Sequence, residues 1–249
     1  MRPHNFLYFL IAAAAFCSGF CVETAELAPK DTSKDYLMGK FQAAAHPDFV
    51  AVPANLTDGR QAYYLRKEAV AAFKEMAAAA AKEGVALRVI SATRSFTHQK
   101  QIWEAKWSGS TLVGGKSLAK TETNDTKRAL KILTYSSMPS TSRHHWGTDF
   151  DINSLNPVYF NKGIGKKTYE WLVAHAAEYG FAQPYTAGRT KGYNEEKWHW
   201  SYTPLAQTMT RNYAQTIENT AITGFDGCTT AIEIDMVNNY VLGVSETCK

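Results

Sequence analysis

One short segment constrains the fold of this 249-residue chain more than any other. From Asp149 to Asn153 the acidic or polar side chains alternate with Phe150 and Ile152. Successive side chains of a β-strand point to opposite faces of the sheet, so this period of two predicts a strand with one apolar and one acidic face. We therefore expect a sheet that packs one face on a core and carries polar chemistry on the other.

Two further strands and several helices are predicted around this strand. Residues 85–91 and 198–202 have the alternation and the β-branched or aromatic content of strands. Apolar residues at helical spacing, with Gly84 as a stop, predict a helix at 66–83. A helix at 166–179 is closed by Gly180, one at 204–218 begins at Pro204, and further helices are expected at 36–44 and 96–107. The Gly-, Ser-, Thr- and Lys-rich stretch 108–126 is predicted to be an insertion or surface loop. This mixture favours the α+β class, with helices flanking a small antiparallel sheet.

The domain organisation follows from composition along the chain. A hydrophobic content of 45% is enough for one sizeable core, which we place at residues 61–220. Residues 26–60, rich in proline and polar side chains, are predicted to be an N-terminal tether or wrap, and residues 221–249 a C-terminal extension. We expect a monomer.

The N-terminus has the layout of a secretory signal. Arg2 is followed by an apolar run at 6–16 and then by small or polar residues, and this run is shorter than the roughly 20 residues of a membrane span. We predict a signal peptide at 1–25, with cleavage after Gly19 or Ala25 and no integral membrane span in the mature chain. Lipid attachment at Cys17 or Cys21 stays open. The expected location is periplasmic or associated with the cell envelope.

The net charge argues against one class of partner. The formal charge is +4, which is too small to indicate nucleic-acid binding.

Two cysteines remain once the signal region is set aside. Cys228 and Cys248 are expected to pair in an oxidising compartment, closing a loop of about 20 residues worth about 3 kcal/mol. The alternative is two free buried thiols.

Two separate segments carry residues suited to metal chemistry. His144 and Asp151 lie seven residues apart with Gly147 between them, so a turn can return the histidine over the strand carboxylate. His199 comes from a distant predicted strand. A catalytic zinc site typically uses three protein ligands and leaves the fourth position to water, so these two imidazoles and one carboxylate predict a Zn²⁺ site.

Glu196 is the candidate catalytic base beside this site. It lies three residues before His199, and on a flat strand that spacing would send the two side chains to opposite faces. Glu196 is therefore expected at the strand entrance or at a bulge. From there it would act as a general acid and base, a role worth about 10² to 10⁴ in rate. Glu195 is the alternative if the register shifts.

These residues form a recognisable pattern. Ser142-x-His144-x-x-Gly147-x-x-x-Asp151 with Glu196-x-Trp198-His199 resembles the LAS-type zinc peptidases, which include vancomycin-resistance D,D-carboxypeptidases and bacterial L,D-carboxypeptidases. The resemblance extends from about residue 63 to 202 and includes Ala92-Thr-Arg-Ser-Phe96 followed by Gln99. It implies a fold like that of the hedgehog and D-Ala-D-Ala peptidases and a zinc peptidase domain at 61–220. The implied site residues are metal ligands His144, Asp151 and His199, base Glu196, oxyanion and substrate group Arg94, and substrate-binding Gln99 and Ser142.

The chain departs from the family pattern at two positions. Asp149 stands where alanine is usual, and Thr93 stands where tyrosine is usual. Asp149 should share a strand face with Asp151, where it either orients a ligand histidine or is a solvated acid.

The resemblance implies a zinc-dependent carboxypeptidase that cleaves peptidoglycan stem peptides at bonds involving D-amino acids. The alternatives are a peptidoglycan endopeptidase, a non-catalytic zinc-containing module that binds cell wall, and a secreted amidase or general protease. The presence of Glu196 favours an enzyme over a binding module, because a module that only binds has no need for a base.

Overall fold

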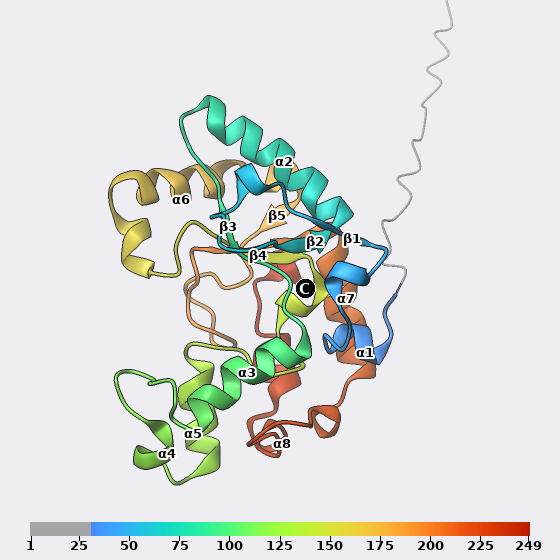
Figure 1. Ribbon diagram of the computed structural model, residues 1–249, viewed down its shortest axis with the longest axis vertical. Coiled ribbons are helices and arrows are strands. Elements are labelled where there is room, and N and C mark those ends of the chain that lie inside the picture. The colour runs from blue at the N-terminus through green and yellow to red at the C-terminus, as the bar shows by residue number, and fades with distance from the viewer. Residues whose placement is uncertain (1–30) are drawn as a thin grey trace, which may run out of the picture.

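The computed structural model describes residues 31–249 and has the predicted mixed α and β structure. A small antiparallel pair is formed by β1 (Phe49–Ala51) and β2 (Tyr64–Arg66). The main sheet is also antiparallel, and its strand order is β3 (Val89–Ser91), β4 (Asp149–Ile152), β6 (His199–Tyr202), β5 (Phe181–Ala182). β3 is shorter than the predicted strand 85–91. Helices lie on both sides of the main sheet (Figure 1).

The central strand β4 has the two faces that its sequence predicts. Phe150 and Ile152 are fully buried in a core, where the Phe150 ring lies 5.0 Å from the Phe73 ring in an edge-to-face arrangement. Asp149 and Asp151 point to the other face. The alternation of apolar and acidic residues thus separates the packing face of the sheet from the face that carries the polar site.

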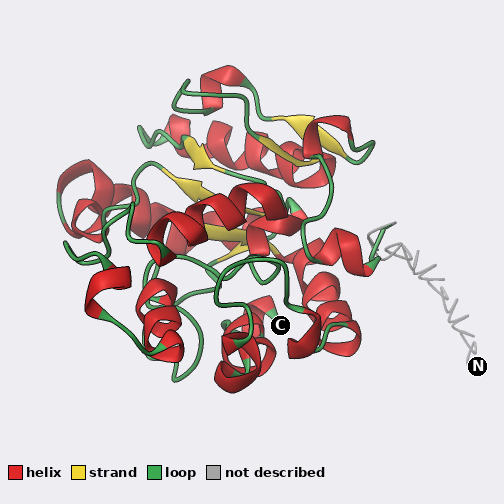
Figure 2. Cartoon of the chain, turned by 60° about the horizontal axis from the view of Figure 1, so that its bottom comes forward, coloured by secondary structure: helices red, strands yellow, loops and turns green. Residues whose placement is uncertain are grey.

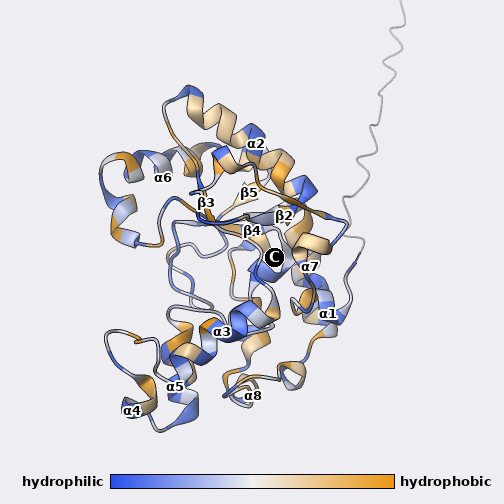
Figure 3. Cartoon of the chain, in the orientation of Figure 1, coloured by the Kyte–Doolittle hydropathy of each residue, from blue (hydrophilic) through white to orange (hydrophobic). Residues whose placement is uncertain are grey.

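Two helices cover the apolar face of the sheet. α2 (Lys67–Lys82) buries Phe73 and Met76 in this core and ends before Gly84, whose φ of +72° suits glycine. α6 (Gly163–His175) begins earlier than predicted and is followed by a 3₁₀ turn at Ala176–Tyr179. Both helices mix hydrophobic and hydrophilic residues, as expected for helices with one buried face (Figure 3).

A second core lies beyond the polar face of the sheet. It is built from residues such as Trp103, Ile132 and Tyr213, all with no exposed surface. Among the helices that contribute are α1 (Lys34–Leu37), α3 (Phe96–Trp107), α5 (Asp125–Leu133), α7 (Thr203–Thr216) and α8 (Thr230–Ile234). Seen from this end of the molecule, helices lie in front of the strands (Figure 2). α3 agrees with its prediction residue for residue.

The described part of the N-terminal segment is a wrap that is anchored to the fold. The Tyr36 hydroxyl donates to the Trp146 carbonyl at 2.9 Å, and the Trp146 indole donates to the Leu37 carbonyl at 3.0 Å. Tyr36 and Leu37 are buried. The helix predicted at 36–44 is wrong in extent, because α1 ends at Leu37 and only a 3₁₀ turn, Ala43–Ala45, follows it.

The stretch 108–126 is more ordered than the predicted loop. It contains the short helix α4 (Leu118–Thr121) and the start of α5, a helix absent from the predictions. The Asn124 side chain caps α5 by accepting a hydrogen bond from the backbone N–H of Lys127 at 2.8 Å. Leu118 is buried in the second core. The capping residue and the buried side chains of Val113 and Leu118 order a segment whose composition alone resembles a loop.

The C-terminal residues are part of the second core, and the predicted disulfide is not formed. Cys228 and Cys248 are unpaired, which contradicts the predicted disulfide. Only Cys248 is buried, whereas Cys228 is partly exposed, so the alternative of two buried thiols holds for Cys248 alone. The two residues are held by different neighbours. The Cys248 carbonyl accepts from Thr210 of α7, whereas Cys228 lies in the turn that leads into α8, with its N–H donating to the Phe225 carbonyl.

Between residues 31 and 249, no helix combines the length and apolar character needed to cross a membrane. The predicted signal peptide at 1–25 and the lipidation candidates Cys17 and Cys21 lie outside the described residues.

Candidate metal centre and active site

His144 is carried back over the sheet by a tight turn. It lies on a 3₁₀ turn, Arg143–Trp146, which ends at Gly147 with a φ of +74°. A side chain at Gly147 would overlap the Phe49 ring, so the position requires glycine for both conformation and space. The His144 Nδ1 atom lies 2.8 Å from the Ala92 carbonyl oxygen, which orients Nε2 toward Asp151 Oδ1 at 3.5 Å.

Asp151 and His199 face each other on neighbouring strands. They are paired in register between β4 and β6, and His199 Nδ1 lies 3.6 Å from Asp151 Oδ1. Antiparallel partners share a face of the sheet, so the strand pairing itself brings the two side chains together. Sequence reasoning predicted the three residues as a group, and the structure brings them together as a buried cluster.

The donor set fits a zinc ion. Zinc–nitrogen and zinc–oxygen bonds of about 2.0–2.1 Å in a tetrahedral arrangement separate neighbouring ligand atoms by about 3.3 Å. Two of the three donor separations, 3.5 and 3.6 Å, are close to this value, and all three donor atoms lie within 4.8 Å of one another. Two of the donor atoms, His144 Nε2 and Asp151 Oδ1, are buried and have no hydrogen-bond partner among the described residues. Buried polar atoms are normally satisfied, and a bound cation would satisfy this pair.

The surroundings of the two histidines shift their pKa values in opposite directions. Burial, together with the positive charge of Arg94, lowers the pKa of His144. Burial would also lower the pKa of His199, but its hydrogen bonds to Asp149 and Glu196 outweigh this effect and raise the pKa to about 9. Burial opposes ionisation of Asp151, yet the neighbouring histidines and Arg94 lower its pKa to about 2. The site therefore attracts positive charge.

Glu196 reaches the same space from the entrance to β6. A turn with a hydrogen bond from the His199 N–H to the Glu196 carbonyl oxygen at 3.2 Å reverses the chain just before the strand. The turn places Glu196 Oε2 3.1 Å from His199 Nδ1 and leaves the glutamate side chain 21% exposed. The predicted position at the strand entrance accommodates the odd spacing between the two residues.

Asp149 lies directly behind His199. Its Oδ1 atom is 3.0 Å from His199 Nε2, on the side of the ring opposite Asp151 and Glu196. Asp149 is completely buried and also accepts from the Arg143 guanidinium at 2.9 Å. Of the two predictions for this residue, the partner of a ligand histidine agrees with the structure, and the solvated acid is wrong.

A cavity of about 600 Å³ opens onto the three donors. Arg94 lies on its wall, with an Nε atom that is buried and has no partner among the described residues. Further polar groups from distant segments line the same cavity, among them Lys106, Ser136, Ser137, Tyr185, Tyr193 and Glu195. Burial and the nearby charge of Arg94 lower the pKa of the Lys106 ammonium, so two cationic groups share this cavity.

Gln99 and Ser142, the other predicted substrate-binding residues, lie outside the lining of this cavity. Gln99 is completely buried and donates from Nε2 to the Ser137 carbonyl oxygen at 2.7 Å. It therefore holds a residue that does line the cavity. Ser142 is also buried, two residues before His144, at the N-cap of the same 3₁₀ turn.

Several cavity residues escaped the sequence reasoning. The Tyr185 ring stands edge-on to His199, with 4.9 Å between centroids, and in turn contacts Tyr193 at 5.1 Å. These tyrosines come from the irregular segment before β6, where no periodicity or motif distinguishes them. Trp198 lies just before β6 and also lines the cavity, whereas Trp200, on the strand itself, is buried in the core. The turn before the strand explains this difference.

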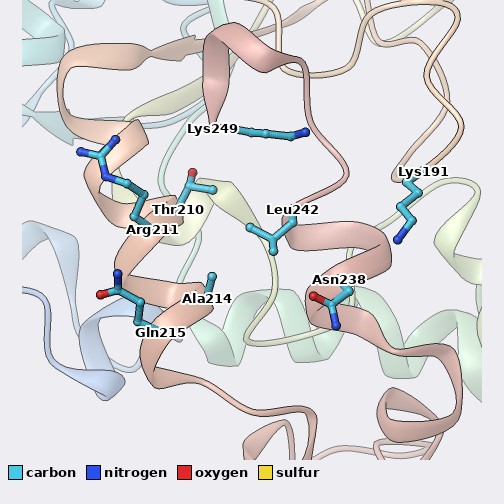
Figure 4. Close-up of a pocket in the computed structure, with 8 residues that line it drawn as sticks. All are labelled: Lys191, Thr210, Arg211, Ala214, Gln215, Asn238, Leu242 and Lys249. Carbon is cyan, nitrogen blue, oxygen red and sulfur yellow. The ribbon is translucent and has the colours of Figure 1, made fainter.

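A second cavity of about 480 Å³ lies between α7 and the C-terminal segment. It is lined by residues such as Arg211, Gln215, Asn238 and Lys249, and none of the candidate metal ligands is among its lining residues (Figure 4). Chemistry at the metal donors therefore belongs to the larger cavity.

A model of one protein family matches most of the domain that contains these residues. It is described as VanY, D-alanyl-D-alanine carboxypeptidase, and it covers residues 62–205, which is more than half of the chain. The chain belongs to the VanY family. The matched range includes both segments of the metal centre and confirms the family predicted from the motifs.

Individual relatives of this VanY-family chain are more distant. YodJ of Bacillus subtilis, a protein assigned as a carboxypeptidase, is 33% identical over 151 residues, which are 57% of this chain. The match covers 47% of YodJ, so this chain spans about half the length of that relative. An uncharacterised protein of Haemophilus influenzae is 32% identical over 89 residues, covering 30% of this chain and 68% of that protein.

Two solved structures align with part of this chain. The LD-carboxypeptidase LdcB is 26% identical, with a TM-score of 0.49, over 66% of this chain and 70% of LdcB. A VanY D,D-pentapeptidase from a VanB-type resistance cassette, solved with Zn(II), is 22% identical, with a TM-score of 0.46, over 66% of this chain and 88% of that one.

Proposed function

We propose that this VanY-family protein is a zinc-dependent carboxypeptidase that trims peptidoglycan stem peptides at bonds involving D-amino acids. One observation carries the proposal: three buried donors of the type that binds zinc converge at the base of a cavity, with the Glu196 carboxylate beside them. Family membership supports a carboxypeptidase acting on the cell wall. The donor set and its spacing support zinc rather than magnesium or calcium, which favour oxygen ligands.

His144, Asp151 and His199 would hold the metal, which when bound acts as a Lewis acid on the scissile carbonyl and promotes ionisation of water. Glu196 Oε2 lies beside the donors and partly faces solvent, so it takes the proton of the attacking water. The same carboxyl group then delivers that proton to the nitrogen of the departing amino acid. One residue thus serves both proton transfers.

Arg94 supplies positive charge on the substrate side of the cavity. Its guanidinium is a permanent cation with a planar set of donors. From the cavity wall it would bind the substrate and stabilise the oxygen that gains charge when water attacks. Two hydrogen bonds fix the neighbouring backbone: the Arg94 N–H donates to the His144 carbonyl at 3.1 Å, and His145 Nδ1 lies 2.6 Å from the Arg94 carbonyl.

The position of Glu196 supports hydrolysis over binding alone. A zinc-containing module that only recognises cell wall gains nothing from a carboxylate beside the metal, because binding requires no group that takes up and returns a proton. Export belongs to the same proposal, since peptidoglycan lies outside the cytoplasm. The predicted signal peptide at 1–25 would provide it.

The test uses purified muropeptides and mass spectrometry. Pentapeptide, tetrapeptide and cross-linked muropeptides are incubated with the zinc-loaded protein, and loss of one C-terminal residue is the expected product. Cleavage of the cross-link alone would favour the endopeptidase. A zinc-loaded protein that leaves every muropeptide unchanged, or that degrades only unfolded casein, would contradict the proposal.

The variant Glu196→Gln tests the role of the base. We expect turnover to fall by at least about 100-fold while zinc content is retained. Glu195→Gln is the matched control, because Glu195 is adjacent in sequence and lines the same cavity. Equal losses in both variants would mean that the base assignment is wrong.

A further inference from the structure

We propose that Asp149 and Arg143 form a positioning pair for His199, which directs the Nδ1 atom of that histidine toward the metal. This inference rests on the metal centre of the proposed function. Neither residue of the pair lines the cavity, so neither contacts substrate. Their effect would reach the reaction only through the orientation of the imidazole.

The two nitrogens of His199 face different groups. Nε2 lies 3.0 Å from Asp149 Oδ1, and Nδ1 lies on the side of Asp151 and Glu196, at 3.6 and 3.1 Å. An ionised carboxylate only accepts hydrogen bonds, so Asp149 requires a proton on Nε2. A neutral imidazole has one N–H, and placing it on Nε2 leaves the lone pair of Nδ1 for a metal.

The Asp149 carboxylate is itself fixed by several donors. Its Oδ1 atom accepts from Arg143 Nε at 2.9 Å, and its Oδ2 atom accepts from the hydroxyl groups of Thr148 at 2.6 Å and Ser201 at 3.0 Å. The residue has no exposed surface. With every oxygen engaged, the carboxylate cannot rotate away from His199 without breaking other hydrogen bonds.

Arg143 anchors the pair to the second core. Its three remaining contacts are hydrogen bonds from Nη1 to Thr210 at 2.8 Å and from Nη2 to Ser201 at 2.9 Å, and a stacking contact with Trp146 at 4.8 Å. Thr210 belongs to α7 (Figure 4). The side chain is 1% exposed, and a buried guanidinium of this kind needs a buried partner such as Asp149.

The pair also links the two ligand histidines. Arg143 precedes His144 on the same 3₁₀ turn, while Asp149 lies on β4 two residues before Asp151. The hydrogen bond between Arg143 and Asp149 therefore fastens the turn that carries His144 to the strand that carries Asp151. Its loss should loosen the whole donor set, and the orientation of His199 most of all.

The first measurement uses the wild-type protein. Nitrogen-15 NMR of the histidine side chains, with and without zinc, reports which nitrogen of His199 carries the proton and which binds the metal. We expect an Nε2–H in both states and zinc on Nδ1. Coordination through Nε2 would overturn the proposal without any variant.

The second measurement uses variants that avoid a lone buried charge. In the double variant Asp149→Asn with Arg143→Gln, both charges are removed together, and we expect zinc affinity, measured by competition with a chelator, to fall by about 10- to 100-fold. His145→Gln is a control in the same turn, because His145 contacts the Arg94 carbonyl rather than a ligand. Thermal unfolding verifies that each variant is folded.

The outcomes separate this proposal from the proposed function. Zinc affinity of the folded double variant within about twofold of the wild type would overturn the positioning pair while leaving the metal centre intact. A wild-type protein that binds no zinc would overturn both. A wild type that binds zinc but cleaves no muropeptide would overturn only the proposed function, because zinc affinity and the NMR spectrum are independent of activity.

Discussion

Zinc loading at pH 7 should release about one proton, and His199 should be its source. Its hydrogen bonds to Asp149 and Glu196 raise the pKa of this buried histidine to about 9, whereas the pKa of His144 is lowered. At pH 7, two units below its pKa, His199 is about 99% protonated in the metal-free protein, and His144 is already neutral. Zinc must displace the proton on Nδ1 to bind there.

The magnitude follows from the same shift. Displacing a proton two units below the pKa costs about 3 kcal/mol, so zinc affinity at pH 7 should be about 100-fold below its plateau above pH 9. Between pH 6.5 and 9 the affinity should rise about tenfold per unit, and above pH 9 it should level off.

Isothermal titration calorimetry provides the assay. Zinc titrations in buffers with different ionisation enthalpies give the number of protons released, and chelator competition gives the affinity across the pH range. His175→Ala is the control, because His175 is a more exposed histidine whose Nδ1 atom contacts Glu178 rather than the metal donors. A proton count near zero with a flat affinity profile would refute the protonation of His199 deduced from its contacts.

Three further predictions concern stability. The raised pKa of His199 should add on the order of 3 kcal/mol to the free energy of unfolding of the metal-free protein. This contribution is fully present below pH 6.5 and should be lost as pH rises through 9, and urea unfolding at several pH values would detect the loss. Gly147→Ala should destabilise by at least 1–2 kcal/mol in thermal unfolding, and by more than Gly59→Ala, which has a similar φ of +75° but open space around it. Phe150→Ala should cost about 3–5 kcal/mol in urea unfolding, against less than about 0.5 for the exposed Val173→Ala, and similar losses would contradict the assigned core.

Local patterns in the sequence predicted the parts of the site that depend on short-range geometry. The alternation around Phe150 defined the strand and its two faces, because a period of two is a property of any extended chain. Gly147 predicted a turn, because a left-handed backbone favours glycine. The odd spacing between Glu196 and His199 required a bend before the strand, and the turn at Glu196–His199 provides it.

Other features depended on segments that meet only after folding. Tyr185 contacts His199 and Lys106 lies near Arg94 because the loop before β6 and α3 dock on the same side of the sheet. No periodicity in either segment indicates that contact. The cysteines predicted to pair, Cys228 and Cys248, are free in the folded chain. Their spacing in the sequence does not determine which side chains surround each thiol.

Residue type and spacing along the chain were enough to identify the candidate metal donors, the strand that presents Asp151 and the protein family. The tertiary structure alone decided that Asp149 is a buried partner of His199 and not a solvated acid. Its environment is built by Arg143 from the preceding turn, Ser201 from the neighbouring strand and Thr210 from α7. A carboxylate on a strand face can be exposed to solvent or buried, and only the elements that pack over that face decide which.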